Sequence, residues 1–338
     1  MTSTTTASRP APPDEDRGTR LGAGLWSSPW VVPVAALLGW FVGLLPWLVT
    51  RSRQGTFGTP WNPRNDLRDA LLPYHHQLLP LLVVVAVVAG ILAGSAPWCA
   101  TARRSRRLVL AALTTLGALL GAGWSVVQTL APDPDLGGSG ATADRVRLAF
   151  VAVTVAGALL GLALGLTVSL AGAAVRAVAA APAAVFVADW LGRVVLAGVG
   201  SPGPTWLSTL IAALSGAAVG LALTRTARSH PVARVAAWAC SLGLLVVTAS
   251  ALTAMRYVLE ALRGTPIRGD ALSELLADGV RVLGGSLEAN LTAGGPPPAA
   301  PLVAVVVAAA VGAVGTLLVA RASRSRDGAG RSLPHPRS

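Results

Sequence analysis

Residues 302–320 read LVAVVVAAAVGAVGTLLVA and depart from apolar character only at Gly312, Gly315 and Thr316. At about 1.5 Å of rise per residue, a helix over this stretch reaches roughly 28 Å, close to the thickness of the hydrocarbon core of a bilayer. A helix on the surface of a soluble protein needs a polar face, and this stretch has none. The stretch therefore predicts a transmembrane helix.

The composition extends this prediction to most of the chain. Of the 338 residues, 53% are hydrophobic and only 12% are charged, about half the charged share of a soluble domain. We therefore predict an all-α fold, a polytopic integral membrane protein built as a bundle of about eight transmembrane helices. The predicted spans are 28–50, 77–98, 107–131, 147–174, 178–200, 205–224, 233–257 and 300–321.

The flanking segments have a different composition. Residues 1–24 are rich in Thr, Pro and charge, which predicts a disordered cytoplasmic tail. Residues 25–321 form the predicted transmembrane domain, and residues 322–338 form an Arg-rich cytoplasmic tail. No cleavable signal peptide is expected, because the first apolar run starts too late and is too long.

The arginines predict the orientation of the bundle, because cytoplasmic loops carry an excess of basic residues. All 27 basic residues are arginines. With both termini in the cytoplasm, sixteen arginines fall on the inner side, ten on the outer side and Arg193 within a span. The basic run at 102–107 marks the inner side, and the acidic, Gly-rich loop 131–144 marks the outer side. The ten outer arginines are Arg51, Arg53, Arg64, Arg68, Arg145, Arg147, Arg256, Arg263, Arg268 and Arg281.

The predicted orientation has one exception. Arg51 and Arg53 lie on the outer side, where the rule disfavours basic residues.

The exclusive use of arginine, together with abundant Ala, Gly, Leu and Val, is typical of a GC-rich bacterial genome. The expected location is therefore the bacterial cytoplasmic membrane.

Glycines recur at four-residue spacing in four of the spans. This spacing places them on one face of a helix, where two backbones can approach closely. The two interpretations are tight packing within the chain and a face for dimerisation. The glycines in question are Gly90, Gly94, Gly117, Gly121, Gly157, Gly161, Gly165, Gly216 and Gly220.

Asp189 and Arg193 are charged residues inside the fifth span, four positions apart on one helix face. Charges at this depth are costly and usually face protein or water. The functional interpretation is a polar path for translocation with a proton- or ion-sensitive switch. The structural interpretations are a self-neutralising pair that fixes the rotation of the helix, or a span shifted so that Arg193 reaches the interface.

His75 and His76 are expected at the outer mouth of the second span. Adjacent histidines point to different faces of a helix, which is poor geometry for one metal ion. We interpret them as interfacial polar residues, with a metal-binding or pH-sensing role as the alternative. The two cysteines, Cys99 and Cys240, are expected to be small buried residues and not a redox pair.

The long outer loop 258–299 contains an amphipathic pattern, loosened by glycines. It predicts a helix that lies on the outer membrane surface or caps the bundle, or alternatively a lid over a cavity. The apolar face comprises Leu272, Leu275, Leu276, Val280, Leu283 and Leu287, and the polar face comprises Asp270, Glu274, Asp278, Arg281 and Glu288.

The sequence contains no phosphate-binding loop, no HExxH zinc helix and no GxSxG elbow. We expect a protein that is not an enzyme, with no cofactor and no metal. The basic segments lack interleaved aromatics, so nucleic acid is not an expected partner.

The sequence is consistent with two functions. One is a permease-like membrane subunit with Asp189 and Arg193 lining a polar path. The other is a non-transporting accessory or cell-envelope assembly protein. Besides the lipid bilayer, other membrane subunits or a separate ATPase are candidate partners, because uphill transport would need an ion gradient or such an ATPase.

The predicted topology can be tested with reporter fusions. A reporter fused after residue 104 should read as cytoplasmic, and one fused after residue 138 should read as extracytoplasmic. Alkaline phosphatase and green fluorescent protein activities in whole cells measure the two compartments. The same compartment at both positions would contradict the arrangement.

Overall fold

Every regular element in the described part of the chain is helical. The computed structural model describes residues 30–54, 71–74, 78–99, 107–130, 141–199, 205–261, 269–292 and 300–330. The predicted tail 1–24 and the histidines His75 and His76 lie outside these residues. The elements are α2 Val31–Gly43, α3 Leu45–Gln54, α4 Leu79–Gly94, η3 Ala96–Cys99, α5 Arg107–Leu130, α6 Ala141–Leu170, α7 Ala173–Val199, α8 Thr205–Thr224, η5 Arg225–Arg228, α9 Pro231–Ala261, α10 Gly269–Thr292 and α11 Ala300–Gly330.

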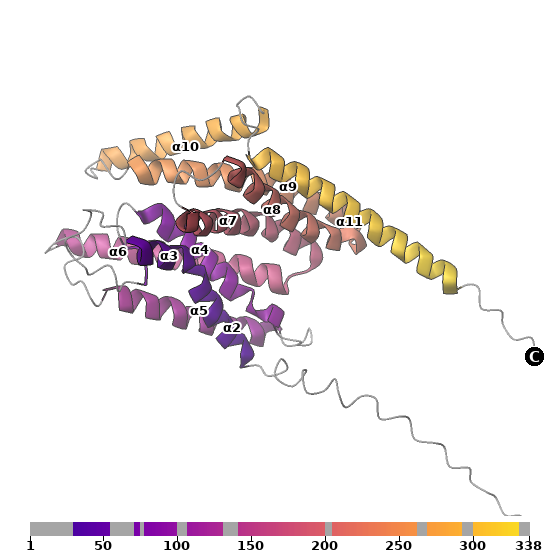
Figure 1. The fold of residues 1–338 in the computed structure, drawn as a ribbon, viewed down its shortest axis with the longest axis horizontal. Coiled ribbons are helices and arrows are strands. Elements are labelled where there is room, and N and C mark those ends of the chain that lie inside the picture. The colour runs from indigo at the N-terminus through magenta and orange to yellow at the C-terminus, as the bar shows by residue number, and fades with distance from the viewer. Residues whose placement is uncertain are drawn as a thin grey trace, which may run out of the picture.

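Seven of these helices are long and apolar enough to cross a bilayer. They are α4 to α9 and α11, and α2 is a shorter apolar helix. The start of α2 and the end of α11 lie toward the same side of the bundle (Figure 1). The prediction of an all-helical membrane bundle is thus confirmed, with about seven to eight spans.

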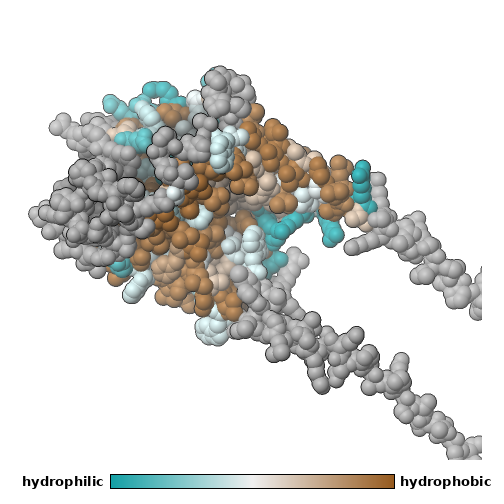
Figure 2. Space-filling model, in the orientation of Figure 1, coloured by the Kyte–Doolittle hydropathy of each residue, from teal (hydrophilic) through white to brown (hydrophobic). Residues whose placement is uncertain are grey.

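The surface of the bundle is apolar where lipid would surround it. Large hydrophobic side chains stand exposed on several spans, including Leu108 at 87%, Val235 at 67% and Trp124 at 64%. Hydrophobic residues cover the middle of the face seen in Figure 2, and hydrophilic residues gather toward the ends of the helices. A soluble monomer does not expose continuous apolar surface on this scale, so the protein resides in a lipid bilayer.

The first predicted span, 28–50, differs from the expectation of one continuous helix, because the chain breaks at Leu44 between α2 and α3. Pro46 has no amide hydrogen and cannot continue the helical hydrogen-bond ladder. The Leu44 amide instead donates to the Phe41 carbonyl at 3.1 Å, one residue nearer than in an α-helix. The indole of Trp190 on α7 donates to the Gly43 carbonyl oxygen at 2.8 Å, so a neighbouring span supplies a hydrogen-bond donor to the backbone at the break.

Helix α4 is the centre of the bundle and is apolar on all sides. One of its faces belongs to a core shared with α2, α5 and α6, and the other faces α7 and α9. Val85 and Ala89 lie in the first core, and Val84 and Val88 lie in the second. A helix without a polar stripe fits this central position, because neither face meets water.

The predicted glycines lie where helices approach most closely. A Cβ at Gly94 of α4 would stand 2.7 Å from the Leu162 carbonyl oxygen of α6, and one at Gly165 would stand 2.8 Å from the Gly94 Cα. Of the remaining glycines, Gly90, Gly157 and Gly161 face the same α4–α6 contact, Gly117 and Gly121 face α2, and Gly216 and Gly220 face α11. The structure therefore brings all nine into contacts within the chain.

Polar side chains complete these contacts. The indole nitrogen of Trp40 donates to Ser125 Oγ at 3.0 Å, and Ser125 Oγ donates to the Gly121 carbonyl at 2.8 Å. Ser169 Oγ donates to the Gly94 carbonyl oxygen at 3.1 Å. These bonds link α2 to α5 and α6 to α4, and they supply partners that lipid does not offer.

Residues 71–74, which precede the predicted histidine pair, dock on the end of α5. The amides of Leu71 and Leu72 donate to Gln128 Oε1 and Thr129 Oγ1 at 2.9 and 3.0 Å. The ring of Tyr74 stacks on Phe150 with 5.3 Å between centroids. Burial raises the pKa of the Tyr74 phenol above its ordinary value, so Tyr74 is a neutral, packed residue.

Helix α11 continues to Gly330, so the first part of the predicted tail 322–338 is helical. Two details depart from the sequence-based expectations. Cys240 is exposed and not buried, because its face of α9 is turned outward. Helix α10 occupies the predicted amphipathic segment. Val280 of the expected apolar face is nevertheless 69% exposed, because the neighbouring Gly279 packs against Val258 of α9 in its place.

The α4–α6 contact yields a stability prediction. A Cβ at Gly161 would overlap the Val87 carbonyl oxygen, so Gly161→Val should destabilise the fold by about 1–3 kcal/mol through forced separation of the helices. Unfolding in mixed micelles of rising SDS content measures this change. Gly243→Val is the matched control, because a Cβ there meets nothing within 4 Å. Equal stability of the two variants would contradict the role of the glycine contact.

Candidate functional site

Asp189 and Arg193 lie on α7, in the half of the helix that leads to α8. Asp189 is ten residues from the end of the helix at Val199, which is about 15 Å along the axis. Pro182 interrupts the hydrogen bonding of α7 about two turns earlier. The helix thus carries one carboxylate at membrane depth and an arginine one turn nearer the interface.

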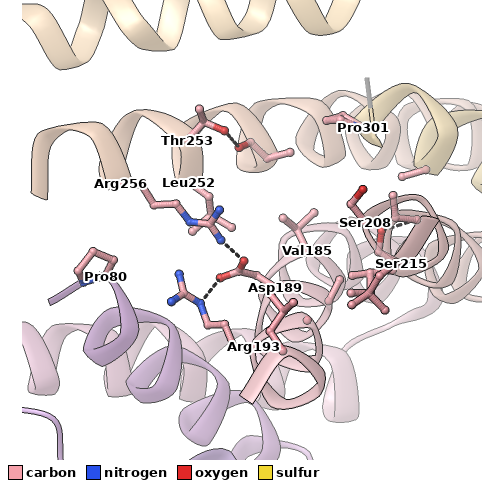
Figure 3. Close-up of a pocket in the computed structure, with 18 of the residues that line it drawn as sticks. Pro80, Val185, Asp189, Arg193, Ser208, Ser215, Leu252, Thr253, Arg256 and Pro301 are labelled. Atoms are coloured by element: carbon pink, nitrogen blue, oxygen red, sulfur yellow. Dashed lines mark hydrogen bonds and ion pairs between the residues drawn. The ribbon is translucent and has the colours of Figure 1, made fainter. Parts of the chain in front are cut away.

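The structure places Asp189 between two arginines from different spans. Arg193 Nε donates to Asp189 Oδ2 at 3.0 Å, and Arg256 Nη2 of α9 donates to Asp189 Oδ1 (Figure 3). The side chain of Asp189 is 16% exposed and that of Arg256 is 42% exposed. The pair predicted from the sequence is therefore part of a three-residue cluster, which we call the ion triad.

Sequence reasoning missed Arg256 as a partner. It counted Arg256 among the outer arginines because Arg256 stands near the end of its span. Only the packing of α9 on α7 brings the two residues together across 67 positions. The sequence did offer one indication: Arg256 lies close to the end of an apolar span, 233–257, that contains no acidic residue to pair with it.

The ion triad leaves hydrogen-bond donors without a protein acceptor. One carboxylate is shared by two guanidinium groups, and Arg256 Nε is buried with no hydrogen-bond partner among the described residues. Arg193 turns its Nη nitrogens away from Asp189 (Figure 3). A guanidinium has five N–H donors and no acceptor, so the remaining donors can bond to an oxygen acceptor, such as that of an anion, a carbonyl group or water.

The ion triad forms part of the wall of a cavity of about 850 Å³. In the described part of the chain, six helices contribute to the wall: α4, α7, α8, α9, α10 and α11. Apart from the ion triad, its surface is mainly apolar, with small contributions from hydroxyl and amide groups and from the Glu260 carboxylate. The apolar side chains include Leu78, Leu81, Val185, Leu196, Leu207, Ile211, Leu245 and Leu252.

The cavity extends from the end of the bundle at which α8 begins to the middle of the membrane span. Ser208 lies near the start of α8 and Ser215 lies at its midpoint, and both line the cavity. Glu260 and Asn290 line it beside the ends of α9 and α10. Asn290 Nδ2 donates to Ser250 Oγ at 2.8 Å, which fixes α10 against α9 next to the cavity.

The predicted packing glycines do not line this cavity. The packing glycines serve the helix contacts described above, and the histidines lie outside the described residues. Within the described ranges, no group of three or more His, Cys, Asp or Glu side chains could hold a metal ion. Comparisons of the chain with protein-family models, with curated proteins and with solved structures found no match.

The ion triad yields a second stability prediction. Asp189→Asn removes the charge that compensates two arginines and should destabilise the fold by about 1–3 kcal/mol, below the range for a fully buried pair because water reaches Arg256. The double variant Asp189→Asn with Arg256→Gln should lose less than the sum of the single changes. Unfolding in mixed SDS micelles measures both.

The matched control is Asp278→Asn, which breaks the exposed pair of Asp278 and Arg281 on α10. An exposed pair contributes about 0–1 kcal/mol. If Asp189→Asn were no more harmful than Asp278→Asn, the ion triad would not be a structural link between α7 and α9.

Proposed function

We propose that the protein is a permease-like membrane subunit whose solute path includes the cavity beside the ion triad. The observation that supports this proposal is the cavity of about 850 Å³ lined by Asp189, Arg193 and Arg256 and reaching Ser215 at mid-span. A self-neutralising pair that only fixed helix rotation would need neither a third partner nor adjoining space. Ligand sites between spans of transporters combine these features.

The ion triad would act as a switchable link. It joins α7 to α9 across the wall of the cavity, so its rupture would free one side of the wall to move. Two weak points in the helices lie nearby: Pro182 within α7, and the break at Leu44, whose Gly43 carbonyl is held by Trp190 beside Asp189. Breaks of this kind are where membrane helices bend during transport.

Several further assignments belong to the same proposal. The cavity opens on the extracytoplasmic side of a bacterial cytoplasmic membrane, since the distribution of arginines places the start of α8 outside. The protein is not an enzyme in this proposal, because Asp189 is engaged in ion pairs and Glu260, the other carboxylate that lines the cavity, has no histidine or further carboxylate beside it in the described part of the wall. Transport uses an ion gradient or a separate ATPase subunit.

A non-transporting accessory role is the second candidate. The tight glycine contacts between α4 and α6 favour it, because they make that half of the bundle a dry scaffold. In this role the cavity would be a fixed recess on one side of the membrane. The two functions differ in whether the middle of α8 is reached by water from one side or from both.

Thiol labelling at Ser215 separates the two functions. In a background of Cys99→Ala and Cys240→Ala, Ser215→Cys should react with a membrane-impermeant maleimide in right-side-out vesicles and also in inverted vesicles. The expected reason is alternating access, in which a mid-span position faces each compartment in turn. Mass spectrometry of the purified full chain measures the labelled fraction.

Leu214→Cys is the matched control, because Leu214 precedes Ser215 on α8 and is exposed on the outside of the bundle. It should stay unlabelled in both preparations, since lipid excludes the reagent. Labelling of Ser215→Cys from one side alone would overturn the transport proposal and favour the accessory function. No labelling from either side would contradict a water-filled cavity.

A further inference from the structure

We infer that the cavity beside the ion triad binds an amphiphile with an oxyanion head, a phosphate or carboxylate, and an apolar body. This inference rests on the proposed function and names the class of its substrate. The head would bind to the free guanidinium donors of Arg193 and Arg256. The apolar body would occupy the part of the cavity that leads to mid-span.

The charges of the ion triad favour an anion. Two guanidinium groups contact one carboxylate, so one positive charge in the contact cluster is unbalanced. Glu260 also lines the cavity, but its side chain is exposed and it stands one helical turn beyond Arg256, nearer to water. An exposed carboxylate is screened by solvent, and its effect on the cluster is weaker than that of the contacting groups.

The hydrogen-bond geometry favours an oxyanion over a halide. Asp189 uses Arg193 Nε and Arg256 Nη2, and the remaining guanidinium donors include the buried, unpartnered Arg256 Nε. Planar guanidinium groups match the spacing of oxygens in carboxylates and phosphates. An oxyanion would provide an acceptor for the Nη donors of Arg193, which point away from Asp189 (Figure 3).

The walls favour an apolar body attached to that head. From the ion triad toward mid-span, the lining includes Val185, Ile211, Leu245 and Leu252, together with alanines such as Ala212. A small hydrophilic anion would gain nothing from this surface, whereas an alkyl or ring system would bury apolar area against it. The apolar lining continues from the ion triad toward mid-span, which is the direction in which the acyl chain of a lipid extends from its head group.

Binding of dodecyl phosphate to the full chain in dodecyl maltoside tests the inference. Calorimetric titration should show saturable binding to the unmodified protein. Arg193→Gln should weaken that binding at least fivefold, whereas Arg281→Gln should leave it within twofold. Arg281 is the matched control because it also pairs with an aspartate on its own helix but is 80% exposed and outside the cavity.

The apolar part of the site has its own variant and its own probes. Ala249→Phe fills the cavity without touching the ion triad and should weaken dodecyl phosphate binding at least fivefold, which keeps the test decisive if Arg193→Gln fails to fold. Inorganic phosphate should bind at least tenfold more weakly than dodecyl phosphate. Dodecyltrimethylammonium, with the same chain and the opposite charge, should show no saturable binding.

Three results would overturn the inference. They are unchanged dodecyl phosphate binding in both cavity variants, equal binding of the cationic amphiphile, and inorganic phosphate binding as tight as that of dodecyl phosphate. The last result would assign the site to a free oxyanion. Binding of phosphatidic acid presented in vesicles then shows whether the oxyanion is also accepted when it is the head group of a lipid. If dodecyl phosphate binds but Ser215→Cys is labelled from one side alone, the ligand class is supported and transport is rejected. If Ser215→Cys is labelled from both sides but dodecyl phosphate does not bind, transport is supported and the ligand class is rejected.

Discussion

The close approach of α4 and α6 is the constraint on which the bundle depends. Lipid offers no hydrophobic force that drives helices together, so their association relies on packing and on hydrogen bonds. Glycines on both helices let the two backbones touch, as at Gly94 and Gly165. With one face fixed on α6, the other face of α4 is presented to α7 and α9, and the second core assembles there.

The ion triad follows from this arrangement. A carboxylate at the depth of Asp189 needs compensation, because the membrane interior solvates charge poorly. Arg193 supplies one partner from the same helix, and α9 supplies Arg256 because it packs on α7. The remaining donors and the apolar walls occur together in one cavity, and this coincidence of charge and open space supports a role beyond helix orientation.

The spans could be predicted because hydrophobicity is a local property that each segment carries by itself. The exception is the first span, where Pro46 was visible in the sequence but the hydrogen bond from Trp190 of another helix to the Gly43 carbonyl was not. The pair of Asp189 and Arg193 could be predicted from its four-residue spacing. Arg256 could not, because nothing near it in the sequence indicates which span it faces.

By itself, the sequence determined that this chain resides in a lipid bilayer, the approximate ranges of its spans, and which glycines lie on one face. These properties follow from composition and helical periodicity, which act over a turn or a span. Only the tertiary structure decided which glycine faces which helix, that Asp189 has two arginine partners, and that a cavity adjoins them. Those outcomes depend on contacts between spans that are far apart in the sequence. The free energy of such contacts depends on how the surfaces of two helices fit together, which no local sequence pattern reveals.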